Sequence, residues 1–147
     1  AAERGVAPAR MGELTRLLEG IDEALKGDVA DMDFDGYVDL NAAFHEKLWG
    51  LASQTIRREI ERVTSLPFAS PSAFLDKQAN VEAFRRSLYG AQTQHRAMVE
   101  AIALREGSRA EALAREHARL ARQNLEFVLD QDRSLIRRVP ALSLVVG

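Results

Sequence analysis

Three histidines are the residues of this sequence best suited to chemistry, because each lies on an apolar face of a predicted helix. The chain has no other histidines. His45 precedes Leu48 by three residues, His95 precedes Met98 by three, and His117 continues the pattern in a later helix. Burying an imidazole is costly unless its ring nitrogens find partners. Two interpretations follow: three separate core histidines, each bonded to a neighbour, or three that converge on one metal ion.

Convergence would create a site for a divalent metal. Imidazole nitrogen binds Zn²⁺, Ni²⁺ and similar ions, and helical bundles build metal sites from inward side chains on facing helices. Asn41 precedes His45 by four residues, so both side chains reach the same side of one helix. The Asn41 amide oxygen is a weaker ligand than a carboxylate, and a hydrogen bond on the helix surface or in the core is its alternative role. We expect zinc, with nickel or another transition metal as alternatives.

The elements that must position these residues are helices, because apolar side chains recur at helical spacing along most of the chain. Ser108 and Glu111 form a capping-box pattern, which predicts the start of the last helix with Ser108 as its N-cap. Pro67 and Pro71 interrupt the helical pattern in the apolar stretch before the fourth helix. The pattern predicts an all-α antiparallel bundle. Its helices are expected at about residues 8–26, 34–52, 55–65, 80–105 and 108–129.

Composition narrows the function classes. A chain of 147 residues predicts one domain, with 46% apolar and 29% charged residues as in ordinary globular proteins. The absence of cysteine excludes disulfides and thiolate metal sites. A net charge of −2 argues against nucleic-acid binding by the chain as a whole. No apolar run approaches the roughly 20 residues of a membrane span, so we expect a cytoplasmic protein without membrane contact.

Three blocks that contain the histidines match a known family. They read NAAFH at 41–45, QHRAMVEAI at 94–102 and REGSRAEALAREH at 105–117. In this order and spacing the sequence resembles the FCD domain, the C-terminal effector-binding domain of FadR-type regulators in the GntR family of transcription factors. LPFASPSAF at 66–74 and ARQNLEFVL at 121–129 resemble the VanR-like subgroup.

The resemblance implies a helical bundle with an internal pocket for a divalent metal and a small carboxylate effector. The metal ligands would be Asn41, His45, His95 and His117. Many members have Asp where this sequence has Asn41. The neutral amide would leave the site more cationic, which strengthens attraction for an anion and weakens retention of the metal.

The resemblance also implies a homodimer that reaches DNA only through an N-terminal winged helix-turn-helix domain, and nothing in this sequence resembles that domain. We expect the effector-binding bundle to span residues 1–133, without the family's first helix, and a C-terminal tail to span 134–147. The bundle would control DNA binding by the separate domain in response to a small organic acid.

Polar and apolar residues near the histidines are expected to contact the effector. Asn124 lies two turns after His117 on the same face. The complete expected set is Asn124, Arg96, Gln92, Phe44, Leu48 and Met98.

Sensing is favoured over catalysis because the carboxylates next to the histidines are in the wrong place for a general base. Glu46 and Glu116 are sequence neighbours of histidines, and adjacent positions lie about 100° apart around a helix. Glu100 lies off the His95 face for the same reason. Two alternatives remain open at this point: a metal-dependent helical-bundle enzyme and a metal-free helical dimerisation module.

Overall fold

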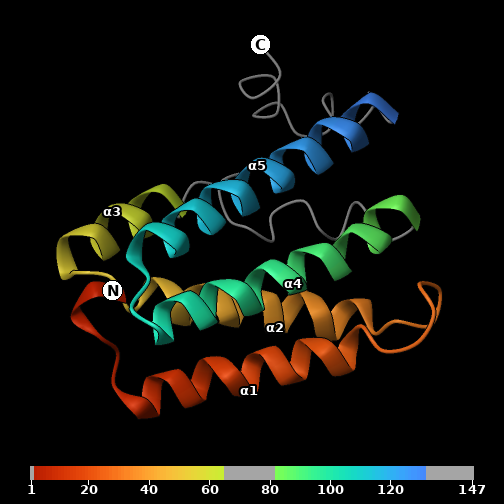
Figure 1. The fold of residues 1–147 in the computed structure, drawn as a ribbon. Helices are drawn as coiled ribbons and strands as arrows, with labels where there is room; N and C mark the ends of the chain where they lie inside the picture. Colours follow the sequence, from red (N-terminus) through yellow and green to blue (C-terminus); the bar gives the residue numbers. More distant parts are fainter. Residues whose placement is uncertain (1, 65–81, 132–147) are drawn as a thin grey trace.

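The computed structural model describes residues 2–64 and 82–131, and within these ranges the chain forms a bundle of α-helices with no strand (Figure 1). A short 3-10 helix, η1, precedes five α-helices. The bounds are Ala2–Arg4 for η1, Pro8–Ala24 for α1, Phe34–Trp49 for α2, Gln54–Thr64 for α3, Glu82–Ala103 for α4 and Gly107–Gln131 for α5. The all-α prediction is confirmed. The stretch 66–74 and the tail 134–147 lie outside the described residues.

Three helices build the core, with α1 packed against both α2 and α4. Their apolar residues recur every three or four positions, so each helix turns one continuous face toward the others. The loop between α1 and α2 adds Leu25 and Met32 to this core. The buried core residues from the helices include Leu14, Leu18, Ile21, Phe34, Tyr37, Phe44, Phe84, Leu88 and Val99.

The first two long helices begin at residues that favour helix starts. Pro8 lies in the first turn of α1, where its missing N–H has no intrahelical partner to lose. Asp33 caps α2, because its carboxylate accepts a hydrogen bond from the Gly36 N–H at 3.0 Å. None of the helices in the described ranges is long and apolar enough to cross a bilayer.

The corner between α4 and α5 differs from its prediction. The Glu106 N–H donates to the Ala101 carbonyl at 2.8 Å and the Arg105 N–H to the Ile102 carbonyl at 3.2 Å, which is a Schellman motif. Arg105 has a φ of +61°. The next helix then begins at Gly107, and the Glu106 carbonyl accepts from the Ala110 N–H at 2.9 Å.

The prediction that Ser108 caps the last helix is therefore wrong. Ser108 lies inside the first turn of α5, because the tight end of α4 lets the new helix start at Gly107. Glu111, the expected partner of Ser108 in the capping box, forms an i, i+4 ion pair with Arg115 at 2.6 Å.

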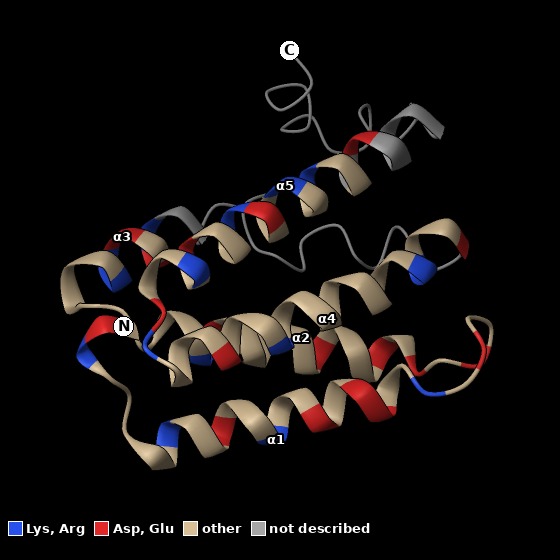
Figure 2. Ribbon diagram, in the orientation of Figure 1, with Lys and Arg blue, Asp and Glu red and all other residues tan. Residues whose placement is uncertain are grey.

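Helix α5 packs against α4 and forms an outer layer of the bundle (Figure 1). Its charged residues pair along its own outer surface, as in Glu116 with Arg119 and Arg122 with Glu126 (Figure 2). A half-buried stripe at helical spacing runs along its inner side. The stripe consists of Ala110, Leu113, His117, Leu120 and Asn124.

Candidate metal centre

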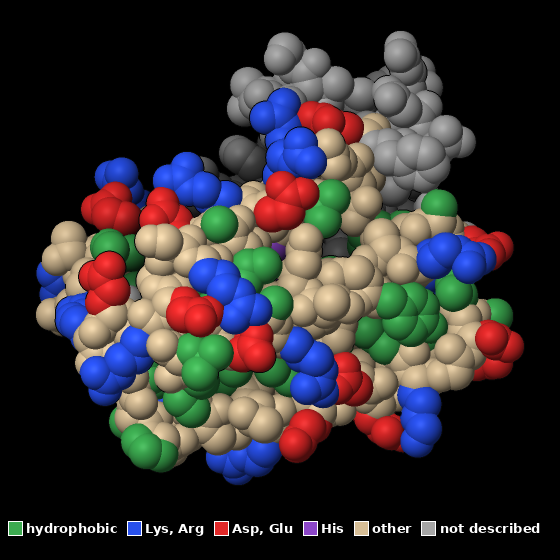
Figure 3. All heavy atoms as spheres, in the orientation of Figure 1, with side chains coloured by type: hydrophobic (Ala, Val, Ile, Leu, Met, Phe, Trp, Pro, Cys, Tyr) green, Lys and Arg blue, Asp and Glu red, His purple; other side chains and the backbone are tan. Residues whose placement is uncertain are grey.

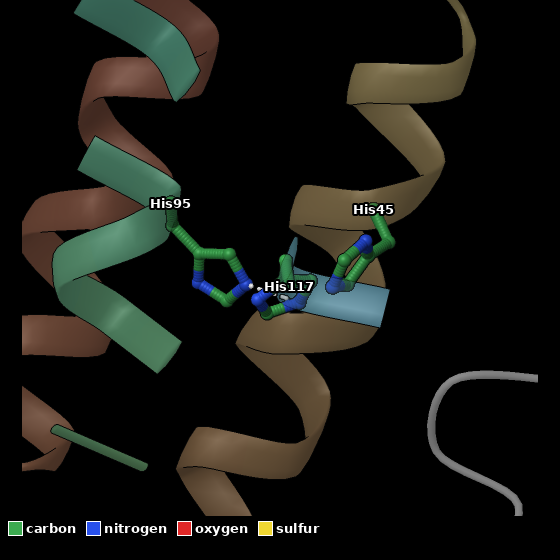
Figure 4. Close-up of side chains that lie close together, drawn as sticks. All are labelled: His45, His95 and His117. Atoms are coloured by element: carbon green, nitrogen blue, oxygen red, sulfur yellow. Dashed lines mark hydrogen bonds between the residues drawn. The ribbon is translucent and has the colours of Figure 1, made fainter. Parts of the chain in front are cut away.

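The three histidines come together from three different helices, with His45 on α2, His95 on α4 and His117 on α5 (Figure 4). One nitrogen from each ring lies within 4.8 Å of the other two. His95 is fully buried, His45 is 8% exposed and His117 is half-buried. In the space-filling view, only a small area of histidine surface is visible on the face shown (Figure 3). The bundle therefore encloses a compact imidazole cluster.

The inward face of α4 explains the position of His95. Leu88, Gln92, His95 and Val99 follow one another at intervals of three or four residues, and all four are buried. Helical spacing thus places a polar pair, Gln92 and His95, within an otherwise apolar stripe. Such a pair is stable only when its polar atoms are hydrogen-bonded.

Gln92 supplies the partner of His95. The Gln92 Nε2 donates to the Leu18 carbonyl at 2.9 Å and to Asp22 Oδ1 at 2.7 Å. Both of these partners are acceptors, so the Gln92 Oε1 is the atom that faces His95, at 3.2 Å from its Nδ1. The Nδ1 of His95 must therefore bear the proton, and its Nε2 has a lone pair.

His117 has a matching contact. Its Nδ1 lies 3.0 Å from the Oε1 of Gln94. With the proton of the neutral ring on Nδ1, as donor to this oxygen, Nε2 has a lone pair. The Nε2 atoms of His95 and His117 are 3.2 Å apart (Figure 4). Two lone pairs at that distance cannot form a hydrogen bond, whereas a cation that both nitrogens bind would remove their repulsion. The donor set therefore fits a divalent metal that prefers imidazole nitrogen.

The protonation state of the rings agrees with this geometry. Burial, with His117 nearby, lowers the pKa of His45 to about 4. Burial, with His117 and His45 nearby, lowers the pKa of His95 to about 2. Burial also lowers the pKa of His117. The three rings are therefore neutral at pH 7, the form in which imidazole binds a metal.

Asn41 is buried one turn before His45 on α2. Its Oδ1 accepts a long hydrogen bond, at 3.5 Å, from the hydroxyl of Tyr37. Burial raises the pKa of Tyr37, which keeps its hydroxyl protonated as a donor. A contact of this length is weak, so it leaves the Asn41 oxygen with most of its capacity to accept or ligate.

Of the apolar residues expected to contact an effector, Phe44 packs against the cluster. Phe44 is fully buried, with its ring centroid 4.5 Å from that of His95 and 5.5 Å from that of His45. Met98 is buried and Leu48 half-buried.

The polar residues expected to contact an effector have other partners in this structure. Asn124 donates from its amide nitrogen to the Ser87 hydroxyl at 2.9 Å, which joins α5 to α4. Arg96 forms an ion pair with Asp22 across α4 and α1, with both side chains partly exposed. The structure thus brings Gln92 against the histidines and places Arg96 beside α1.

The carboxylates next to the histidines in sequence are exposed, as expected. Glu100 pairs with Arg109 at 2.7 Å, and Glu116 pairs with Arg119 at 3.1 Å. Glu46 is exposed on α2. None of these three is placed as a general base for the imidazole cluster.

The fold and the cluster define a class of protein: a helical domain with an internal imidazole site that fits a divalent metal. The model of the FCD domain family matches residues 1–120, so this chain belongs to that family. FCD domains are the effector-binding regulatory domains of GntR-type transcription regulators. No curated protein was found to match the sequence. The VanR-like subgroup stays a prediction.

Two residues of the site were not found from sequence. Tyr37, the partner of Asn41, lies four residues before it, so the helical repeat that linked Asn41 to His45 could have identified it. Asp22 contacts Gln92 across 70 residues of sequence, and no local pattern pairs them.

Proposed function

We propose that this chain is a metal-dependent, effector-sensing domain of a GntR-type regulator, in which His45, His95 and His117 bind a divalent metal, with zinc the best candidate. Asn41 is the proposed fourth ligand. The observation that supports the proposal most strongly is the convergence of three imidazoles from three helices, with one nitrogen of each ring within 4.8 Å of the others and the Nε2 atoms of His95 and His117 3.2 Å apart.

The proposed ligand of the domain is a small organic acid. The metal, when bound, supplies a Lewis-acidic position open to a carboxylate oxygen. Because Asn41 is neutral, the protein cancels neither of the ion's charges, which favours an anionic ligand. Phe44, Leu48 and Met98 form the proposed apolar wall.

Asn124, Arg96 and Gln92 are the proposed polar contacts of the effector. Asn124 would have to exchange the Ser87 hydroxyl for the effector, and Arg96 would have to leave Asp22. Gln92 is within reach of His95 but is committed to three partners. Of the three, Asn124 therefore requires the smallest rearrangement.

The proposed sensing mechanism depends on which helices carry the metal-binding histidines. The histidines come from α2, α4 and α5, so ligation and effector binding would fix these helices relative to one another. An effector that prefers one helix arrangement shifts the population toward it. In the proposed regulator, a homodimer passes this shift to a separate DNA-binding domain.

A hydrolytic enzyme is the less favoured function. Metal-assisted hydrolysis needs a group that accepts a proton from the attacking water. The carboxylates that neighbour the histidines in sequence, Glu46 and Glu116, are exposed. Within the described part of the chain, the side chains other than histidine that hydrogen-bond His95 and His117 are instead the amides of Gln92 and Gln94, which can hold a ligand but cannot accept a proton at neutral pH.

Metal analysis of protein purified without chelator tests the proposal directly. We expect about one bound ion per chain, and an increase in melting temperature when zinc is added to the chelator-treated protein. His95→Ala should abolish both results, whereas the exposed Glu116→Gln should change neither. The proposal fails if the protein binds no metal and neither chelator nor zinc changes its melting temperature. That result is the one expected of a metal-free helical module.

A second measurement tests the effector. Small carboxylates added to the zinc-loaded protein should raise its melting temperature further, and the same compounds should have no effect on His95→Ala. An equal shift in the zinc-loaded protein and in His95→Ala would show that carboxylate binding does not use the metal.

A further inference from the structure

The buried amide of Gln92 lies where α1, α4 and the histidine cluster meet. Its side chain contacts the Leu18 carbonyl and Asp22 on α1 through Nε2, and His95 through Oε1. Gln92 as a whole is 5% exposed. A glutamine with both ends engaged in a buried position has a fixed orientation, because a flipped amide would place Nε2 against His95 and Oε1 against two acceptors.

This orientation has a chemical consequence for His95. A neutral imidazole has its proton on either nitrogen, and the hydrogen bond made by one nitrogen decides which of the two is available to a metal. The Gln92 oxygen lies 3.2 Å from Nδ1 and can only accept. The proton is therefore held on Nδ1, and the Nε2 lone pair points to the other histidines.

Asp22 completes the arrangement from α1. One of its oxygens accepts from Gln92 Nε2 at 2.7 Å, shorter than the contact of the same nitrogen with Leu18. Asp22 also pairs with Arg96, but both of those side chains are more than 40% exposed, and a surface ion pair contributes little. The contact that links Asp22 to the cluster is thus its hydrogen bond with Gln92.

The corresponding contact of His117 is less constrained. Gln94 is only half-buried, and its contact with His117 is part-buried. Of the two glutamines, Gln92 is therefore the one whose orientation is set by the fold independently of the histidine that it contacts.

We propose that Gln92 is a positioning residue for metal binding, anchored by Asp22, and that it holds His95 as the Nδ1–H tautomer with Nε2 ready to ligate. The inference rests on the proposed metal site and deepens it. Hydrogen-bond partners of this kind orient a metal-ligating histidine, and their loss typically weakens metal binding by about 10- to 100-fold.

The test uses the 147-residue chain in four variants. Gln92→Met keeps the length of the side chain and removes both polar ends. Asp22→Val removes the acceptor of Gln92, whereas Asp22→Asn retains an oxygen at that position. Thr93→Val is the matched control, because Thr93 neighbours Gln92 but is exposed and bonds only its own helix, at the Tyr89 carbonyl.

Two readouts separate this inference from the proposed function. The first is the imidazole ¹⁵N–¹H correlation spectrum of the chelator-treated protein, which reports the tautomer of each histidine without any metal. The second is zinc affinity, measured by competition with a chromophoric chelator. Circular dichroism confirms that each variant is folded. If Gln92→Met does not fold, Asp22→Val takes its place in the test, because Asp22 is partly exposed and its substitution disturbs the core less.

We expect His95 to show the Nδ1–H tautomer in the wild-type chain, in Asp22→Asn and in Thr93→Val. Gln92→Met should lose this preference and bind zinc about 10- to 100-fold more weakly. Asp22→Val should shift both readouts in the same direction by a smaller amount. Recovery in Asp22→Asn would show that the hydrogen bond, and not the charge of Asp22, matters.

An unchanged His95 tautomer in Gln92→Met, or zinc affinity equal to that of the wild type, overturns the inference while leaving the metal site intact. A wild-type chain that binds no zinc overturns the proposed function instead, and the tautomer spectrum then still decides whether Gln92 orients His95.

Discussion

The two sides of the histidine cluster differ in how firmly the protein holds them. On one side, His45 and His95 belong to helices that share a continuous apolar core with α1. On the other side, His117 belongs to α5, in which every described side chain is at least partly exposed. The difference indicates that one half of the site lies in the core, and that the other half lies in a partly exposed outer layer.

The polar contacts of α5 support this view. Of the described polar contacts between the α5 stripe and α4, two are made by His117, with His95 and Gln94, and a third joins Asn124 to Ser87 two turns away. Exposed contacts give less stabilisation than buried apolar ones. A ligand that binds His117 and His95 together would therefore stabilise the position of α5 more than that of α1, α2 or α4.

The largest effect should come from comparing His95→Ala with His117→Ala. His95→Ala removes a fully buried ring and leaves Gln92 without its partner, so we expect the free energy of unfolding to fall by about 2–4 kcal/mol. His117→Ala, at a half-buried position, should cost roughly 1 kcal/mol or less. Urea denaturation in chelator measures both.

Both substitutions should abolish zinc binding equally, although they should lower the free energy of unfolding by unequal amounts. Equal destabilisation by the two would contradict the division into a core half and an outer half.

Zinc itself should distinguish the two halves. At a free zinc concentration of 100 times the dissociation constant, binding stabilises the folded state by about 2.7 kcal/mol. We expect hydrogen exchange to slow more in α5 than in α1, because α5 carries one of the ligands and has no fully buried side chain among its described residues, whereas α1 is anchored in the core. Hydrogen-exchange mass spectrometry with and without zinc measures this, with His117→Ala as the control. Uniform slowing across all helices would argue against a separately held α5.

Lowering the pH should destabilise the metal-free chain. The folded-state pKa values of His45 and His95, about 4 and about 2, lie below the ordinary 6.5, so the unfolded state takes up protons first. The contribution of the neutral rings to the free energy of unfolding is complete above pH 6.5. It is lost as the pH falls from there toward 4 for His45 and toward 2 for His95. Each histidine contributes up to about 1.4 kcal/mol per pH unit within that window.

Substituting single histidines shows how much of this pH dependence comes from each half of the site. His95→Gln should flatten the dependence of unfolding free energy on pH more than His117→Gln, because the His95 ring is the more deeply buried of the two. Urea titrations at several pH values between 4 and 7 measure the slopes. A greater flattening by His117→Gln would reverse the assignment.

The smallest effect concerns the corner that joins the two halves. Arg105 has a left-handed backbone at the end of α4, where glycine is favoured. Arg105→Gly should stabilise the chain by about 1 kcal/mol. Arg105→Ala is the control, because it removes the guanidinium that packs on Gly5 and retains the strain. Thermal denaturation should rank glycine above arginine and arginine at or above alanine, and a destabilising glycine would show that the Gly5 contact outweighs the strain.

The helices could be predicted from sequence because their signals are local. Apolar spacing, Pro8 at a helix start and the i, i+4 pairs of Glu82 with Arg86 and Glu111 with Arg115 all act within a few residues. The start of α5 was misplaced because the Schellman motif that ends α4 competes with the capping signal of Ser108. That competition depends on the backbone conformation of Arg105, which its residue type does not predict.

The site was determined at two levels. The sequence by itself determined which imidazoles face inward, since helical periodicity alone places His45, His95 and His117 on apolar stripes. Their convergence within 4.8 Å, the tautomer of His95 and the unequal burial of the rings were decided by tertiary structure. The physical reason is range: periodicity acts over one turn of helix, whereas a hydrogen bond such as that from Gln92 to Asp22 joins side chains 70 residues apart, and only packing brings them together.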